Sequence, residues 1–214
     1  MNFDIEKYHN HVETISDNQL INCKVFSNRE SALKYLIPQS IDYLEIGVLG
    51  GDYSQLVLNS KNVKSATLLD TFKMWDWEGA KVRRFDETEH LNFVKKRFEK
   101  YNNVFLEIGN SQDILPLKDK KFDYIYIDAD HRFNYVLSDI LKSTEMSKSN
   151  TIIGLNDFIM YASFWEPDNN NRGGFAVAAA VTQFLKYNQS WEVVGYAIEN
   201  NGCSDIYIKP RSVI

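Results

Sequence analysis

The sequence has few cysteines, no strongly basic segment and no long apolar run, and each of these absences argues against a class of protein. Cys23 and Cys203 are its two cysteines and lie far apart, so we expect reduced thiols rather than a disulfide framework or a cysteine-based metal site. No apolar stretch approaches the roughly 18 residues of a membrane span, and residues 1–14 lack the pattern of a signal peptide. The net charge of −5 argues against a nucleic-acid surface. We therefore expect a cytoplasmic protein that binds neither membranes nor nucleic acids.

Apolar strands alternate with helical segments along most of the chain, as a parallel α/β sheet requires. The 214 residues, of which 44% are hydrophobic, can bury one sizeable core. Helices are expected near residues 52–60, 88–101, 132–143 and 174–187. Strands are expected near residues 41–47, 64–70, 103–108, 122–128, 150–156, 191–196 and 204–209. This pattern predicts an α/β fold with a seven-stranded, mostly parallel sheet whose last strand is antiparallel.

The polar residues before the first of these strands predict an N-terminal helical appendage over residues 1–40, followed by a main domain over residues 41–214. Ser27 and Glu30 form a capping box at the start of a helix, and Pro38 closes that helix. The appendage could cover an edge of the sheet, help to form a dimer, or close over a cofactor. The sequence does not choose between these roles.

The segment YLEIGVLGGDYS, residues 43–54, predicts a buried strand that turns sharply into a helix. Gly47 and Gly51 permit positive φ and let a ligand lie against bare backbone. Glu45 stands where dinucleotide-binding turns have their first glycine, and a carboxylate there disfavours a phosphate ligand. It suits a ligand with an ammonium and a carboxylate group, such as S-adenosylmethionine. Asp70, at the end of the next strand, occupies the position where α/β folds bind a ribose diol; alternatively, both acids are simply solvated.

Polar residues also follow two later strands at the same edge of the predicted sheet. Asp128, Asn156 and Asp157 offer three oxygen ligands of the kind that Mg²⁺ accepts. His131 lies within one turn of Asp128 and is suited to removing a proton from a hydroxyl group that the ion orients and acidifies. Alternatively, His131 is a structural histidine that is held by Asp128 or Asp130.

With these motifs the sequence resembles the class I S-adenosylmethionine-dependent methyltransferases. The resemblance covers residues 41–210 and rests on three motifs: the E-x-G-x-x-x-G turn (Glu45, Gly47, Gly51), the ribose acid (Asp70) and the D-x-D-H segment (residues 128–131). It implies a Rossmann-like class I methyltransferase fold with helices on both faces of the sheet.

Within that superfamily the sequence is most similar to the macrocin and mycinamicin sugar O-methyltransferase group, a methyltransferase family 24-like group. Its Mg²⁺ ligands are an acid after the fourth strand and an acidic pair after the fifth, with a histidine base three residues past the first acid. Asp128, His131 and Asp157 match this pattern, whereas Asn156 replaces a glutamate but still offers a carbonyl oxygen. The resemblance implies Mg²⁺-assisted methylation of a hydroxyl group on a small molecule, for example a sugar or a glycoside.

The same resemblance implies further contacts with S-adenosylmethionine. Asn110, Ser111 and Gln112 follow the third strand, where related enzymes contact adenine. Ser54 lies near the methionine end of the cofactor, and Asp128 also belongs to the expected cofactor-binding set. Ser111 is equally consistent with the N-cap of a short helix.

Two longer connections, residues 71–87 and 158–174, are rich in aromatic side chains and follow strand ends, so they are candidates for the substrate wall. Their aromatic residues could equally pack the loops down or form an interface in a homo-oligomer. The alternatives to a Mg²⁺-assisted enzyme are a metal-independent O- or N-methyltransferase, a dinucleotide-binding oxidoreductase, which Glu45 disfavours, and a non-catalytic S-adenosylmethionine-binding protein.

Overall fold

The computed structural model of the chain describes residues 14–73, 89–160, 176–199 and 203–211. These residues form an eight-stranded sheet with the strand order β1-β7-β8-β6-β5-β2-β3-β4. The strands are β1 (Lys24–Phe26), β2 (Ser40–Ile46), β3 (Asn62–Asp70), β4 (Val104–Ile108), β5 (Phe122–Ile127), β6 (Ser147–Met160), β7 (Trp191–Ile198) and β8 (Cys203–Pro210).

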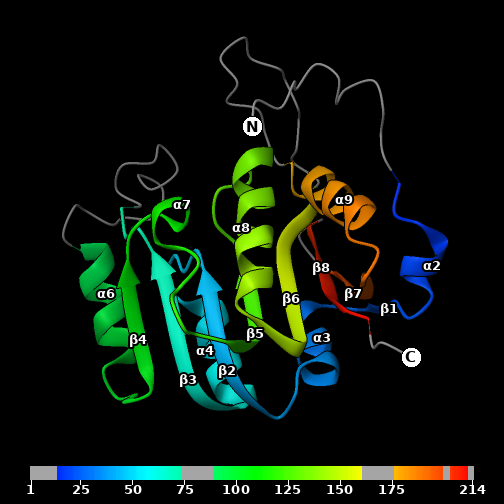
Figure 1. Cartoon of the computed structure of the whole chain (residues 1–214). Helices are drawn as coiled ribbons and strands as arrows, with labels where there is room; N and C mark the ends of the chain where they lie inside the picture. The colour runs from blue at the N-terminus through cyan, green and yellow to red at the C-terminus, as the bar shows by residue number, and fades with distance from the viewer. Residues whose placement is uncertain (1–13, 74–88, 161–175, 200–202, 212–214) are drawn as a thin grey trace.

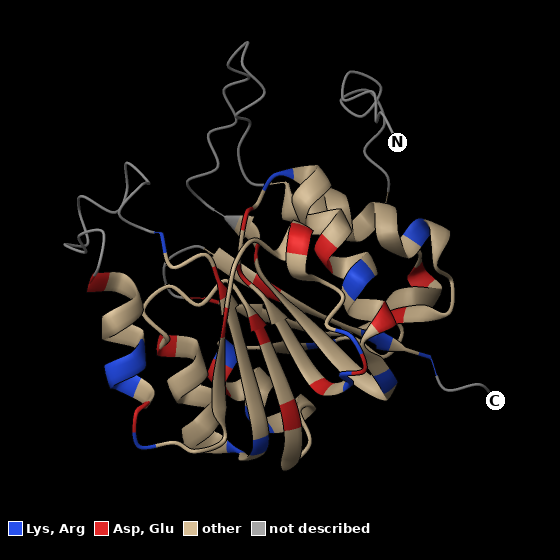
Figure 2. Ribbon diagram, turned by 60° about the vertical axis from the view of Figure 1, so that its left-hand side comes forward, with Lys and Arg blue, Asp and Glu red and all other residues tan. Residues whose placement is uncertain are grey.

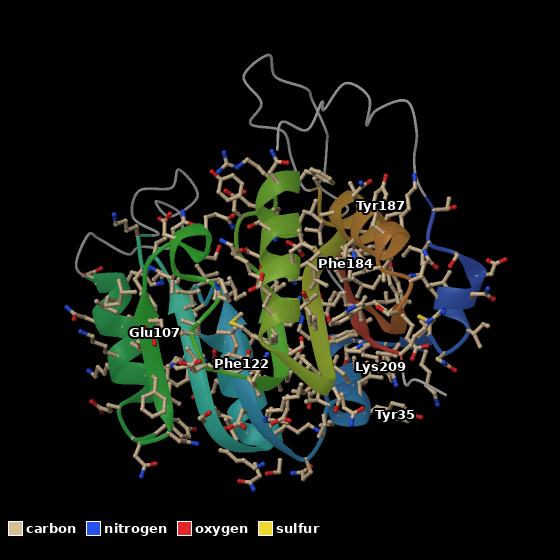
Figure 3. The ribbon with its side chains drawn as sticks, in the orientation of Figure 1. Tyr35, Glu107, Phe122, Phe184, Tyr187 and Lys209 are labelled. Carbon is tan, nitrogen blue, oxygen red and sulfur yellow. The ribbon has the colours of Figure 1, made fainter. Side chains whose placement is uncertain are left out.

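Helices cover both faces of this sheet (Figure 1). The described helices are α2 (Asp17–Leu20), α3 (Arg29–Leu36), α4 (Asp52–Ser60), α6 (Glu89–Phe98), α7 (Ser111–Ile114), α8 (Phe133–Glu145) and α9 (Val177–Tyr187). Helices α8 and α9 contribute to one buried hydrophobic cluster, and α3, α4 and α6 contribute to a second cluster on the opposite face. Phe184 points from α9 toward the sheet and is 2% exposed, whereas Tyr187 at the end of the same helix lies outside this core (Figure 3). None of the described helices is long and apolar enough to cross a membrane.

The pairing of the strands confirms a mostly parallel sheet with an antiparallel last strand. Strand β8 lies between β6 and β7 and is antiparallel to both, and the other strand pairs are parallel. The expected number of seven strands was wrong, because β1 adds an eighth strand beside β7. Three residues at the edge of a sheet are too short to show the alternation by which strands are recognised.

Residues 14–39 are attached to this sheet by both strand pairing and helix contacts. Nε2 of Gln19 in α2 donates hydrogen bonds to the carbonyl oxygens of Leu185 and Trp191, at 2.9 and 3.0 Å. Helix α3 begins after Asn28, whose side chain accepts a hydrogen bond from the backbone N–H of Ser31 at 2.8 Å. The helix was therefore expected correctly, but its N-cap is not the residue that the capping-box pattern indicated.

The carboxyl ends of the parallel strands lie together at the upper edge of the sheet in Figure 1. Acidic residues mark the ends of several strands in Figure 2. Residues that follow β2, β3, β4 and β5 are therefore brought together with the last part of β6, although they are distant in sequence. In open α/β sheets ligands bind at this edge.

Candidate active site

The turn between β2 and α4 requires glycine at two positions. Gly47 has a φ of +86°, and a Cβ atom there would lie 2.1 Å from the carbonyl oxygen of Asp128. Gly51 has a φ of +77°, and a Cβ atom there would lie 2.6 Å from Cε2 of Phe98. Both the backbone conformation and the close approach exclude larger residues. The turn is consequently packed directly against the residue that follows β5.

Asp70, at the end of β3, holds this turn in place. Its Oδ2 atom accepts hydrogen bonds from the backbone N–H groups of Val48 and Leu49, at 2.7 and 3.0 Å. Its Oδ1 atom accepts a third from the N–H of Phe72 at 2.7 Å. A carboxylate has about four acceptor positions, and the hydroxyl of Thr71 is a fourth donor, at 3.4 Å from Oδ1.

Glu45 lies beneath the turn and is 2% exposed. Its Oε2 atom accepts hydrogen bonds from the hydroxyl of Tyr43, at 2.6 Å, and from the hydroxyl of Ser54 in α4. Burial raises the pKa of Glu45 to about 8, although these two hydrogen bonds act in the opposite direction. The carboxyl group is therefore mostly protonated at neutral pH when no ligand is bound.

Asn110, Ser111 and Gln112 lie after β4, beside the end of β3. The N-cap of α7 is Asn110, whose side chain accepts a hydrogen bond from the N–H of Gln112 at 2.9 Å; Ser111 is the first helical residue, so the N-cap alternative for it was wrong. Nε2 of Gln112 donates to Oδ1 of Asp139 in α8 at 2.8 Å. Burial raises the pKa of Asp139 to about 6. The side chain of Gln112 is thus held by a buried acid that the sequence did not single out.

His131 lies between two carboxylates at the other half of the same edge. Its Nε2 atom is 3.5 Å from Oδ1 of Asp128 and 3.8 Å from Oδ2 of Asp157. The backbone N–H of Asp128 donates to the carbonyl oxygen of Ile46 at 2.8 Å, which ties this group to the end of β2. Burial raises the pKa of Asp128, although the hydrogen bond with His131 lowers it. The structure thus brings Asp128, His131 and Asp157 together at one place.

An irregularity in β6 places Asp157 in this group. The register between β6 and β8 shifts between Leu155 and Ile159, and Asp157 has a φ of +51°. Left-handed conformations are uncommon for residues other than glycine, and strand irregularities near active sites redirect side chains. Regular alternation along β6 would have given Asp157 another direction.

The side chain of Asn156 contacts Asp205 in β8. Its Nδ2 atom donates to Oδ1 of Asp205 in β8 at 3.1 Å, and the hydroxyl of Tyr126 donates to Oδ2 of Asp205 at 2.7 Å. Burial raises the pKa of Asp205 to about 6, so the carboxylate is mostly ionised at neutral pH and accepts both hydrogen bonds. The amide oxygen of Asn156 must then face away from Asp205.

The metal expectation fits these residues only in part. The carboxylates of Asp128 and Asp157 are hard oxygen donors that suit Mg²⁺, and the amide oxygen of Asn156 is a third donor of the right chemistry. Within the described part of the chain, however, no group of three or more His, Cys, Asp or Glu side chains is arranged to hold a metal ion. The two acids contact His131 instead.

Sequence reasoning missed Arg29, Glu199 and Asp205, of which Arg29 pairs with both acids and Asp205 accepts a hydrogen bond from Asn156. Asp205 is 0% exposed, and an acid inside the apolar strand of residues 203–208 was the signal that could have found it. Asp130, the other acid considered as a partner of His131, accepts hydrogen bonds from the side chain and backbone of the neighbouring arginine, Arg132. Most of the two candidate substrate-wall loops, residues 71–87 and 158–174, lies outside the described residues.

Comparison with known proteins gives one family and many structural neighbours. The model of a family described as "Methyltransferase domain" matches residues 44–158. The structure is similar to the O-methyltransferase TomG from Streptomyces achromogenes, which is involved in tomaymycin synthesis and was solved in complex with SAM (14% identity, 86% of this chain and 78% of that chain, TM-score 0.58). It is also similar to the N-methyltransferase NodS from Bradyrhizobium japonicum (13% identity, 86% of this chain and 95% of that chain, TM-score 0.58). A third similar structure is an rRNA methylase from Streptococcus thermophilus (8% identity, 86% of this chain and 95% of that chain, TM-score 0.57). No curated protein matches the sequence.

Proposed function

Because the chain belongs to the family of methyltransferase domains and is an S-adenosylmethionine-dependent methyltransferase, we propose that it methylates a hydroxyl group of a small molecule. The proposed acceptor is a sugar or a glycoside, since Asp128, His131 and Asp157 match the residue pattern of the sugar O-methyltransferase group. The observation that carries the proposal is the position of His131, whose Nε2 atom lies 3.5 and 3.8 Å from two carboxylates at the cofactor edge of the sheet.

The residues of the chain divide the work of the proposed reaction. When bound, S-adenosylmethionine supplies an electrophilic methyl group. The glycine turn and Asp70 bind the cofactor, and the contact of Gly47 with the backbone of Asp128 fixes the cofactor site relative to the acceptor site. Nε2 of His131 takes the proton of the acceptor hydroxyl, and the carboxylates of Asp128 and Asp157 stabilise the imidazolium that forms.

Mg²⁺ assistance is a separate part of the proposal. Asp128, Asp157 and the amide oxygen of Asn156 would hold the ion, which would lower the pKa of a bound hydroxyl group. The contacts of both carboxylates with His131 also favour a second candidate, a metal-independent O- or N-methyltransferase in which Asp128 and Asp157 only orient and charge-stabilise His131. The non-catalytic alternative has no such supporting contact.

The test is transfer of a labelled methyl group from S-adenosylmethionine to a panel of hydroxylated acceptors, including sugars and glycosides, with amines as comparison. Each reaction is run with Mg²⁺ and with chelator, for the natural protein and for the variants Asp157→Asn and Asp130→Asn. We expect label in a hydroxyl acceptor, loss of most of the rate in chelator and in Asp157→Asn, and little change in Asp130→Asn. Undiminished rates in chelator would instead support the metal-independent candidate. Labelling of amines alone would overturn the hydroxyl proposal.

A further inference from the structure

Acidic side chains dominate the acceptor half of the edge, and S-adenosylmethionine bound at the neighbouring glycine turn would carry a carboxylate of its own. Asp128 and Asp157 contact His131, Asp205 accepts a hydrogen bond from Asn156, and Glu199 and Asp205 both pair with Arg29. Among the ion pairs of the described residues, Arg29 is the positively charged side chain that pairs with acids of this set. An anion bound among four acids is repelled by all of them unless a cation lies next to it.

Arg29 is the first residue of α3, and Glu199 and Asp205 hold it in place. Its backbone N–H donates to Oε1 of Glu199 at 2.5 Å, its Nε atom is 3.3 Å from the same oxygen, and its Nη2 atom is 3.6 Å from Oδ1 of Asp205. A quarter of the side chain is exposed. A guanidinium group has five N–H donors in a planar fork, so donors are left for a ligand on the open side.

Arg29 also lies beside the first turn of α4, where the resemblance places Ser54 near the methionine end of the cofactor. Its guanidinium carbon is 5.8 Å from the centre of the Tyr53 ring, and Tyr53 precedes Ser54 in the first turn of α4. Burial lowers the pKa of Arg29, but Tyr126, Asp205, Glu199 and Asp128 together raise it further, so the side chain stays charged and interacts with Asp128.

We propose that Arg29 binds the carboxylate of the methionine moiety of S-adenosylmethionine. Arginine binds carboxylates through two parallel hydrogen bonds, which gives orientation as well as affinity. The surrounding acids then favour the ammonium group of the same moiety. The inference rests on the proposed position of the cofactor at the glycine turn. It also gives the N-terminal segment a role, because α3 would close over the cofactor rather than only cover the sheet.

The test compares two ligands and two proteins by calorimetric titration. The ligands are S-adenosylhomocysteine and its decarboxylated analogue, which lacks only the carboxylate. Arg29→Gln should weaken binding of S-adenosylhomocysteine by about tenfold to a hundredfold, because a charge-assisted hydrogen-bond pair is lost. The analogue should bind the natural protein and Arg29→Gln equally well. Lys34→Gln removes one exposed positive charge from the same helix and should change neither affinity.

Two further variants separate a ligand contact from a structural role. If Arg29 serves only to neutralise Glu199, then Arg29→Gln and Glu199→Gln will weaken both ligands alike, and the inference is overturned. Arg29→Lys keeps the charge and carries the test if Arg29→Gln does not fold, because it should reduce the preference for the carboxylate-bearing ligand. Equal binding of S-adenosylhomocysteine to the natural protein and Arg29→Gln overturns the role of Arg29 alone. Failure of the natural protein to bind either ligand overturns the proposed cofactor position.

Discussion

The two halves of the carboxyl edge of the sheet are built in different ways. In the half formed by β2 and β3, the contacts involve the backbone. Asp70 accepts hydrogen bonds from three backbone N–H groups, and Gly47 lies against the carbonyl oxygen of Asp128. In the half formed by β5, β6 and β8, side chains contact one another, as His131 does with Asp157. The first half depends on backbone conformation and tolerates few substitutions. The second depends on charge and orientation, so its substitutions should affect the reaction more than the fold.

Gly47→Ala should have the largest effect, because it disturbs both halves. A methyl group 2.1 Å from the carbonyl oxygen of Asp128 cannot be accommodated without moving β5, and alanine at a φ of +86° is strained. We expect the free energy of unfolding to fall by about 3 kcal/mol or more and binding of S-adenosylhomocysteine to be lost. Urea unfolding and calorimetric titration measure the two effects.

Gly50→Ala is the matched control in the same turn. A Cβ atom at position 50 would be 3.8 Å from Cε1 of Phe93, an ordinary contact, and its φ is not in the left-handed region. We expect a change in unfolding free energy of about 1 kcal/mol at most. Equal losses in the alanine variants of both glycines would mean that the contact with Asp128 is not what makes position 47 special.

His131→Gln should have the next largest effect and should act on the acceptor half alone. Loss of a general base lowers the rate of methyl transfer by about a hundredfold to ten-thousandfold. Binding of S-adenosylhomocysteine and urea unfolding should change little, because the turn of the cofactor half does not depend on this side chain. Asp130→Asn, which alters a half-buried acid next to His131 in the sequence, is the rate control. A parallel loss of cofactor affinity in His131→Gln would show that the two halves are not separable.

The difference between the two halves of the edge also explains which features could be predicted from the sequence. The turn at Gly47 and Gly51 and the acid Asp70 lie at positions that local rules connect to a cofactor, because strand, turn and helix follow one another without interruption. The parallel sheet and the helices on both its faces follow from the alternation of segments in the same way. The positions of Asp128 and His131 could be predicted because both follow a parallel strand. Asp157 was expected at the same edge, but it lies within β6 and its direction depends on the irregularity of that strand.

Contacts that depend on the direction of one side chain could not be predicted. Asn156 meets Asp205 only because β8 lies antiparallel beside β6, and Arg29 reaches Glu199 only because β1 and β7 pair. A three-residue strand and a bulge are set by packing between distant segments. The sequence could predict that charged side chains lie at this edge of the sheet, but not which residues they contact.

Glu45 provides a smaller effect that depends on pH. Its pKa in the folded protein is about 8, whereas an exposed glutamate has a pKa of about 4.3. The folded state therefore keeps a proton that the unfolded chain has released, so the stabilisation is fully present below about pH 4 and is lost as the pH rises toward 8. Between pH 6.5 and 7.5 the free energy of unfolding should fall by up to about 1.4 kcal/mol per pH unit.

Glu45→Gln isolates this contribution, because the amide oxygen can still accept hydrogen bonds from Tyr43 and Ser54. Asp139 and Asp205 have pKa values raised to about 6, so their contributions of the same sign are mostly lost by pH 6.5. We expect a flatter dependence in Glu45→Gln than in the natural protein, measured by urea unfolding at several pH values. Identical slopes in the two proteins would show that Glu45 is ionised in the folded state.

The smallest effect concerns the adenine end of the cofactor half, where Asn110 has two possible uses. Its side-chain oxygen caps α7 through the N–H of Gln112, and its amide N–H₂ group is a donor that aspartate lacks. Asn110→Ala should lose about 1 kcal/mol of unfolding free energy through the cap, whereas Asn110→Asp should keep it. If the amide also contacts adenine, Asn110→Asp will bind S-adenosylhomocysteine about threefold to tenfold more weakly at unchanged stability. Unchanged affinity in Asn110→Asp would restrict Asn110 to capping, and the adenine contact would then rest on Ser111 and Gln112.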